Sequence, residues 1–257
     1  MVEAWRNIAH HLKLKGDERL YASAISMLAW SLRTANYHST DGHAESENLF
    51  REAVEIRTRL LGKEHVETAT ALSALGSSLQ MQGRSAEAEP LFREVLELRK
   101  NLKGADVTEA MANLAWSLQG LKRLPEAEQL QAEVLALREE ALGPEHPDTL
   151  TALRALAGCI LEQGRAGEAE PLLRKAVELR GEVLGPLHPD TLVVMGLLAK
   201  CMADQGVYDK AAELYGSAAS GWARTMGSEH VQVQKGKAAQ AACLEKLGSG
   251  SGGASEV

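Results

Sequence analysis

The sequence Leu-Gly-Pro-Glu-His-Pro-Asp-Thr-Leu occupies residues 142–150, and Leu-Gly-Pro-Leu-His-Pro-Asp-Thr-Leu occupies residues 184–192, 42 positions further on. A second motif recurs as well: Gln-Gly-Arg-x-x-Glu-Ala-Glu is found at residues 82–89 and again at 163–170. Repeats of this length form supersecondary units that bury their apolar faces only against neighbouring units. The sequence therefore predicts an array of repeats, and such an architecture favours binding over catalysis.

Each unit contains the pattern of two amphipathic helices. In the first, a small residue has apolar residues four and one positions before it and three positions after it, which is the spacing of one helix face. The small residues of successive units are Ala29, Gly76, Ala115, Ala157 and Ala199. Twelve positions further on, a second helix is marked by Ala88, Ala127, Ala169 and Ala211. No apolar alternation is long enough for a strand, so the pattern predicts an all-α chain.

Glycine, proline and indels define the expected boundaries. Glycines follow both helices of most units, and Pro147 and Pro189 suit the first turn of a helix. We expect an opening helix within residues 1–16, five helical pairs over 17–226, a capping helix over 227–247 and a flexible Gly/Ser tail over 248–257. A five-residue insertion predicts a longer loop near Tyr37 to Gly42. In the capping helix, Lys237 and Gln240 replace apolar residues, which predicts one solvated face.

These features resemble the tetratricopeptide repeat family, and the 42-residue form with Leu-Gly-Pro-x-His-Pro-Asp-Thr between units is similar to the repeats of kinesin light chains. The resemblance covers roughly residues 17–247 and implies a right-handed superhelical solenoid with a protein-binding concave groove. In kinesin light chains that groove is rich in asparagine, which holds an extended peptide. Of the matching positions here, Asn113 alone is asparagine, whereas Met27, Ala74, Ala155 and Leu197 are not.

Composition excludes several classes of protein. The formal net charge of −7 argues against nucleic-acid binding, which requires a basic surface. No apolar run approaches the roughly 18 residues of a membrane span, and the charged N-terminus is not a secretory signal. Three cysteines, Cys159, Cys201 and Cys243, recur with the repeat and are expected to be buried and unbridged. We therefore expect a cytoplasmic protein in a reducing compartment.

The sequence contains no motif typical of catalysis. It lacks GxGxxG, GxxxxGK[ST], GxSxG and HExxH. His65, His146, His188 and His230 share one position between repeats, where we expect them to cap helices rather than bind metal, since period-related residues are too far apart for one ion. We expect no cofactor, no metal and no enzymatic activity.

Partner-binding residues are expected where the first helices face the groove. In arrays of this kind, the positions one after, three before and four after the small residue point toward that face, and Asn113 lies beside them. Trp30 and Trp116 occur there in identical Leu-Ala-Trp-Ser-Leu contexts, and tryptophan is enriched at binding hot spots. The alternative is that both pack against neighbouring helices. The candidate residues are Trp30, Arg33, Ser73, Gln80, Asn113, Trp116, Gln119, Arg154 and Lys200.

Three functional hypotheses follow. The first is a non-enzymatic adaptor that binds an extended peptide or partner helix in its groove. The second is a constitutive structural subunit that contacts its neighbours through the convex face or the edges, and the third, less favoured, is an enzyme. A further partner is suggested by Ser255 and the terminal Val257, which match the short ligand pattern of PDZ domains, although the Gly/Ser stretch before them is equally typical of a disordered end.

Overall fold

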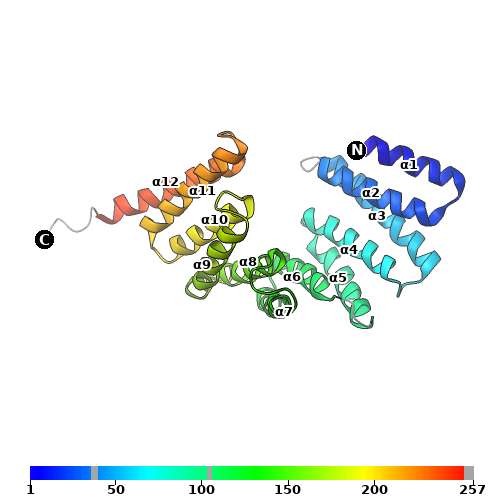
Figure 1. Ribbon diagram of the computed structural model, residues 1–257, viewed down its shortest axis with the longest axis horizontal. Coiled ribbons are helices and arrows are strands. Elements are labelled where there is room, and N and C mark those ends of the chain that lie inside the picture. Colours follow the sequence, from blue (N-terminus) through cyan, green and yellow to red (C-terminus); the bar gives the residue numbers. More distant parts are fainter. Residues whose placement is uncertain (36–39, 103–105, 252–257) are drawn as a thin grey trace. The chain divides into compact units, whose positions relative to one another are not determined.

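In the computed structural model of this protein, the described residues, 1–35, 40–102 and 106–251, form twelve α-helices and no strand (Figure 1). The predicted all-α class is confirmed. In chain order the helices are α1 (Val2–Lys15), α2 (Glu18–Ala35), α3 (Thr40–Leu61), α4 (Val66–Met81), α5 (Ser85–Lys100), α6 (Thr108–Gly120), α7 (Leu124–Leu142), α8 (Pro147–Glu162), α9 (Ala166–Val183), α10 (Pro189–Asp204), α11 (Tyr208–Met226) and α12 (Val231–Ser251).

Tight turns end these helices where the sequence pattern places glycine. Gly164, after α8, has a φ of 78°, and Gly143, after α7, has a φ of 87°. Glycine adopts this left-handed region without the steric cost that a Cβ imposes. Lys122 adopts a φ of 60° at the position that glycine takes in other repeats. The turn geometry is therefore kept even where the residue type does not favour it.

Four helices begin at a histidine that caps their first turn. The Nδ1 atom of His146 accepts a hydrogen bond from the backbone N–H of Asp148 at 3.2 Å. The same bond recurs at His65, His188 and His230. Each imidazole thereby satisfies one of the backbone N–H groups that a helix start leaves without an intrahelical partner. The predicted capping role of these histidines is confirmed.

The chain divides into two compact units, each described here by itself. Unit 1 is Met1–Leu130 and unit 2 is Gln131–Val257, so the boundary falls within α7. From α1 to α6 in unit 1, and from α8 to α12 in unit 2, each helix packs against the next one along the chain. In addition, α4 contacts α6, and α8 contacts α10. The first helices of neighbouring repeats thus contact one another directly, α4 with α6 in unit 1 and α8 with α10 in unit 2.

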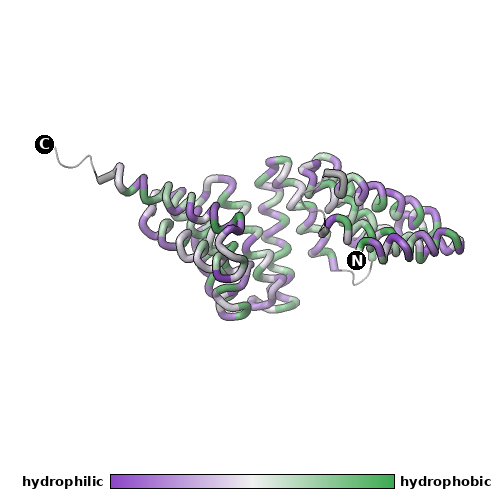
Figure 2. Tube along the Cα trace, turned by 90° about the horizontal axis from the view of Figure 1, so that it is seen from above, coloured by the Kyte–Doolittle hydropathy of each residue, from purple (hydrophilic) through white to green (hydrophobic). Residues whose placement is uncertain are grey.

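The cores are built at the small positions that the sequence pattern marks. Ala29 in unit 1 and Ala157 and Ala199 in unit 2 are fully buried. At Gly76 an added Cβ would lie 2.8 Å from the ring of Phe92, so the approach of α4 and α5 is closer than an alanine permits. Figure 2 shows polar and apolar residues alternating along the helices, as expected of amphipathic helices that bury one face.

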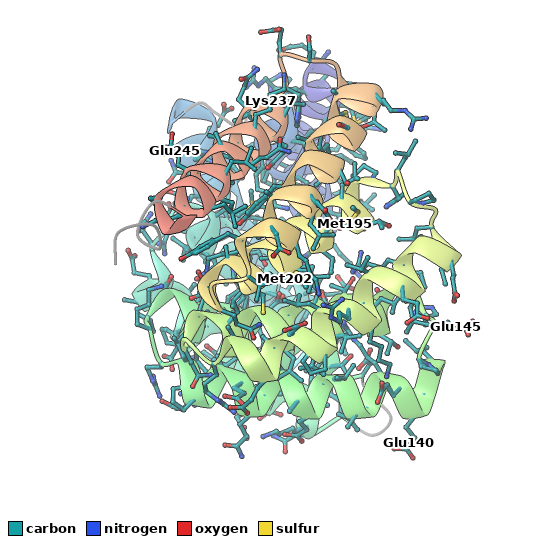
Figure 3. The ribbon with its side chains drawn as sticks, turned by 90° about the vertical axis from the view of Figure 1, so that its left-hand side faces the viewer. Glu140, Glu145, Met195, Met202, Lys237 and Glu245 are labelled. Carbon is teal, nitrogen blue, oxygen red and sulfur yellow. The ribbon has the colours of Figure 1, made fainter. Side chains whose placement is uncertain are left out.

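The last helix has one solvated face. It packs against α11, whereas Lys237 and Glu245 are exposed (Figure 3). The helix continues to Ser251, beyond Leu247, where we predicted its end and the start of a flexible tail. Extending an existing helix requires no new nucleation, so a Gly/Ser stretch can be added to it.

One loop is also shorter than predicted. We expected irregular structure near Tyr37 to Gly42, but α3 begins at Thr40, while residues 36–39 lie outside the described residues. The Ser46 hydroxyl donates a hydrogen bond to the Ala29 carbonyl at 3.1 Å, which attaches the early turns of α3 to α2. The C-terminal segment Ser255–Val257 lies outside the described residues too, so its proposed affinity for PDZ domains remains a prediction.

Candidate functional site

The nine candidate residues all lie on first helices, and we call the surface formed at these positions the first-helix face. Unit 1 contributes seven of them, from α2, α4 and α6, and unit 2 contributes two, from α8 and α10. The first-helix face thus has one part in each unit.

Trp30 on α2 is partly exposed and partly packed. Its side chain is 40% exposed, and its ring meets that of Phe50 edge-on, with centroids 6.1 Å apart. The guanidinium carbon of Arg33 lies 3.5 Å from the centroid of the indole, which is cation–π geometry. Arg33 itself is buried, and one of its terminal nitrogens has no hydrogen-bond partner. Burial accordingly lowers the pKa of Arg33.

Trp116 on α6 has the same exposure in a different environment. It is also 40% exposed, but within the described residues no aromatic ring or guanidinium stacks on its indole. The residue three positions further on is Gln119, which is half-buried and uncharged. The two tryptophans therefore present equal areas to solvent, and only that of Trp30 is covered on one side by a cation.

Two candidate polar residues are buried between first helices. Gln80 donates a hydrogen bond from its side-chain nitrogen to the backbone carbonyl of Trp116 at 3.1 Å. Ser73 accepts a hydrogen bond from the Asn113 side chain at 3.3 Å. Ser73 and Gln80 are each more than nine-tenths buried, so they hold α4 against α6 rather than face solvent. Asn113 is half-buried and keeps part of its surface exposed.

In unit 2 the candidate residues are basic. Arg154 on α8 is half-buried, and Lys200 on α10 is exposed and forms an ion pair with Asp204 at 3.7 Å. Burial is the main cause that lowers the pKa of Arg154, the nearby Arg180 guanidinium adds to this, and Asp190 opposes it. The candidate residues of unit 2 are thus both basic, whereas those of unit 1 include two indoles.

A recurring arginine near the end of the second helices was not predicted from the sequence. These helix-end arginines, each 23 positions after the small residue except where the insertion adds five, are Arg57, Arg99, Arg138 and Arg180. Three of them donate to a backbone carbonyl at the start of the next repeat, at 3.4, 3.2 and 2.9 Å. Arg180 forms an ion pair with Asp190 at 3.3 Å instead. Their common register is the sequence signal that would have identified them.

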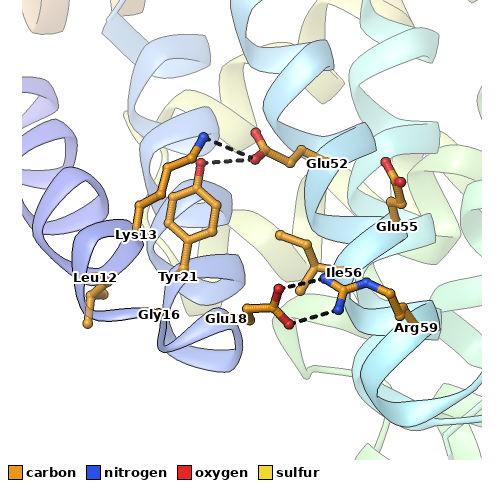
Figure 4. Close-up of a pocket in the computed structure, with 9 residues that line it drawn as sticks. All are labelled: Leu12, Lys13, Gly16, Glu18, Tyr21, Glu52, Glu55, Ile56 and Arg59. Carbon is orange, nitrogen blue, oxygen red and sulfur yellow. Dashed lines mark hydrogen bonds and ion pairs between the residues drawn. The ribbon is translucent and has the colours of Figure 1, made fainter.

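A cavity of about 370 Å³ lies among α1, α2 and α3, outside the first-helix face (Figure 4). Tyr21 donates a hydrogen bond to Glu52 at 3.0 Å, and Glu18 pairs with Arg59 at 2.8 Å. Burial and the bond to Glu52 raise the pKa of Tyr21. Lys13 on α1 also forms an ion pair with Glu52 at 3.8 Å, so the polar groups of this cavity pair with one another and help to attach the opening helix.

Neither the cysteines nor the histidines of the described residues form a metal-binding cluster. Cys159, Cys201 and Cys243 form no disulfide, and their predicted buried positions are confirmed. Within the described ranges, no three His, Cys, Asp or Glu side chains are grouped so that they could hold a metal ion. No helix in these ranges is long and apolar enough to cross a membrane.

Comparison with known proteins identifies the repeat. The model of the tetratricopeptide repeat family matches residues 26–101, 106–180 and 155–224, which is more than half of the chain. Proteins of this family typically build surfaces for protein interaction. Among curated proteins, none matches the sequence.

Solved structures agree on the fold. A putative kinesin light chain with nearly identical TPR-like repeats, from Podosopora anserina, is 25% identical, with 79% of this chain and 96% of that chain covered and a TM-score of 0.66. BtubC (BKLC) from P. vanneervenii is 18% identical, with 80% and 84% covered and a TM-score of 0.68. Aspartyl phosphate phosphatase F from Bacillus subtilis is 14% identical, with 91% and 61% covered and a TM-score of 0.69. The last two likenesses concern the fold alone.

Proposed function

The chain belongs to the tetratricopeptide repeat family, and from this premise we propose that it is a non-enzymatic scaffold that binds an extended peptide or a partner helix on its first-helix face. The observation that supports this most directly is the pair of tryptophans, each 40% exposed at the same repeat position. A soluble protein that leaves indole surface in water at two equivalent positions gains little stability from it, whereas tryptophan is among the residues that contribute most to binding.

The surroundings of Trp116 favour its use in binding. Its indole has no stacking partner of its own in the described residues, and Gln119 and Asn113 beside it expose amide groups that can hydrogen-bond to a peptide backbone. Ser73 and Gln80 then serve as the support that holds α4 and α6 in register beneath this surface. On this proposal, unit 1 recognises the partner through apolar and amide groups.

One observation favours the alternative of a constitutive subunit. The two end helices leave apolar side chains exposed: Leu14 on α1 is 74% exposed, and Val231 and Leu244 on α12 are 55% and 53% exposed. Contacts of neighbouring subunits at these ends would cover them. Under this alternative the isolated chain is expected to self-associate, so sedimentation of the purified protein distinguishes the two functions.

Binding to selected peptides tests the scaffold function. Peptides selected from a displayed library against the full chain would be titrated into the wild type and into Trp116→Ala by calorimetry. If Trp116 is a hot spot, its removal costs about 2 kcal/mol or more, which is roughly a 30-fold loss of affinity.

The control is Leu60→Ala. Leu60 is 42% exposed on a second helix, so this substitution also removes an exposed apolar side chain, but away from the first-helix face. The affinity of this variant for the selected peptides should equal that of the wild type. Selected peptides that bind Trp116→Ala as tightly as the wild type would contradict the proposed surface and leave the constitutive subunit as the better reading.

A further inference from the structure

Two neighbouring first helices of unit 1, α4 and α6, are almost free of charge. Residues 68–81 and 110–120 contain no Asp, Glu, Lys, Arg or His, in a chain in which 25% of the residues are charged. The other first helices carry ionisable side chains in the same stretch, among them Arg33 on α2, Arg154 on α8 and Lys200 on α10. Because α4 and α6 contact each other, the surface around Trp116 is an uncharged part of the first-helix face.

The charges at the starts of these two helices are paired with other elements. Glu67 forms an ion pair with Arg19 on α2 at 2.7 Å, and Glu109 forms one with Arg99 on α5 at 3.1 Å. Glu109 lies seven residues before Trp116, about 10 Å along the helix axis. A charged ligand group buried against Trp116 would therefore lose its hydration without meeting an opposite charge, which is costly. This surface is suited to an uncharged ligand.

The polar groups beside Trp116 offer hydrogen-bond donors. Within the described residues, the side chains of Trp116 and Gln119 form no hydrogen bond. The Asn113 amide donates to the Ser73 hydroxyl at 3.3 Å and has a second N–H. An indole N–H can donate but cannot accept. A ligand that covers these groups must supply acceptors, because a buried donor without a partner costs free energy.

These donors favour an extended ligand over a helix. The backbone carbonyls of a helix accept hydrogen bonds within the helix, so a helix packed on Trp116 by its apolar face would bury the Gln119 amide without an acceptor. In a polyproline II segment the carbonyls have no internal partner, and proline has no N–H that would need an acceptor. Proline-rich segments in this conformation also dock in grooves that are lined by aromatic side chains.

We propose that Trp116, Asn113 and Gln119 form a binding site for an uncharged, proline-rich segment in the polyproline II conformation. The indole ring supplies a platform for a proline ring, and the indole N–H and the two amides donate hydrogen bonds to carbonyls of the segment. Such a segment is stiff before it binds, so it loses little conformational entropy when a few side chains hold it. This inference rests on the proposed function, because it names the kind of peptide that the first-helix face of unit 1 takes.

A capped peptide of about ten prolines is the probe for this site. It would be titrated into the full chain labelled with 5-fluorotryptophan, and the Trp116 signal, identified by its loss in Trp116→Phe, would be followed by ¹⁹F NMR. We expect a saturable shift of this signal. Because no charges are paired in the complex, the affinity should be the same at low and high concentrations of sodium chloride.

Three altered peptides separate the effect of charge from the effect of losing proline. In each of them every third proline is replaced, by glutamate, by lysine or by glutamine. The glutamate and lysine peptides should bind about tenfold more weakly than the glutamine peptide, because their charges would be desolvated without compensation. The glutamine peptide should bind more weakly than polyproline, since it is less stiff.

Gln119→Glu and Gln129→Glu are a matched pair of variants. Both add one negative charge to unit 1, but Gln119 lies beside Trp116, whereas Gln129 is exposed on α7, a second helix. Gln119→Glu removes amide donors and directs a carboxylate at carbonyl oxygens, so it should weaken the binding of polyproline about tenfold. Gln129→Glu should bind as the wild type does. Equal affinities of the two variants would place the peptide away from Gln119 and overturn the proposal.

Failure of this inference differs from failure of the proposed function. The inference is overturned if polyproline causes no saturable shift of the Trp116 signal, or if the glutamate or lysine peptide binds as tightly as polyproline. Peptides selected from the library that lose affinity in Trp116→Ala would then still support the scaffold. If the selected peptides bind Trp116→Ala as tightly as the wild type and polyproline causes no shift, both proposals fail.

Discussion

Unit 1 and unit 2 share a framework and differ in what they place on it. At the position after the small residue, unit 1 has Trp30, Ser77 and Trp116, whereas unit 2 has Gly158 and Lys200. Beneath these positions the small residues are equally buried in both units. Since the same backbone supports indoles in one unit and open or charged positions in the other, the fold does not dictate these side chains. Differences between equivalent positions are therefore the best guide to function in a repeat protein.

The largest expected effect is on the free energy of unfolding, and it tests whether the helix packing of the two units is equivalent. Leu114 and Leu156 precede the small residue of their repeats and are 3% and 8% exposed. Replacing either with alanine should lower the free energy of unfolding by about 2–5 kcal/mol, because each leaves a cavity among packed helices. Urea denaturation of the two variants would show this. If the substitution in one unit left the free energy of unfolding unchanged, the two units would not share an equivalent core.

The next largest effect is a difference in stability between the alanine variants of the two tryptophans. Trp30→Ala should lower stability by about 2 kcal/mol, below the range for a fully buried tryptophan, because it removes the contact with Phe50 and uncovers Arg33. Trp116→Ala should leave the melting temperature nearly unchanged. Thermal unfolding followed by circular dichroism measures both. Equal losses of stability would mean that Trp116 is packed as Trp30 is, and its role in binding would lose its support.

A smaller effect is expected when the environment of Trp30 is made like that of Trp116. Arg33→Gln gives the repeat of Trp30 the same residue that the repeat of Trp116 has at this position, Gln119. The substitution removes both a cation–π contact and a buried charge. These opposing terms leave a net change in stability of about 1 kcal/mol or less. In protein labelled with 5-fluorotryptophan, the solvent-isotope shift of Trp30 should rise toward that of Trp116. An unchanged shift would show that Arg33 does not cover the indole.

The smallest effect concerns Asn113. Its hydrogen bond to Ser73 is long, at 3.3 Å, and Asn113→Ala should cost about 0.5 kcal/mol, the lower end for a neutral hydrogen bond. A double-mutant cycle with Ser73→Ala isolates that bond. If Asn113 also contacts a peptide, as the resemblance to kinesin light chains implies, Asn113→Ala should weaken peptide binding as well. A change in stability alone would restrict Asn113 to a supporting role.

Helix placement was predictable because it follows from spacing and turn residues. The starts of α8 and α10 at Pro147 and Pro189 agree with the pattern to the residue. The start of α3 was not predictable, since its first turns contain threonine, aspartate and glycine, and they become helical where contact with α2 overrides local preference. The end of α12 was missed for another reason: extension of an existing helix needs no new nucleation, so the helix continues past Leu247 to Ser251.

The site was less predictable than the fold. Repeat register placed all nine candidates on first helices, but it could not show that Ser73 and Gln80 are buried by the contact between α4 and α6. It also could not show that Arg33 folds back over Trp30. Both outcomes depend on the reach of individual side chains across a helix–helix contact. Periodicity defines which face a residue occupies, and only coordinates define what covers it.

The histidine caps have a consequence for the chemistry of the turns. In each of them Nδ1 accepts a backbone hydrogen bond, so it has no proton, and the neutral imidazole must have its proton on Nε2. In free histidine both tautomers coexist, whereas here one hydrogen bond selects the same tautomer at four turns. Every turn of this type therefore presents an N–H donor at Nε2 when the imidazole is neutral, and the Nδ1 lone pair that could otherwise bind a metal ion is directed into the start of a helix.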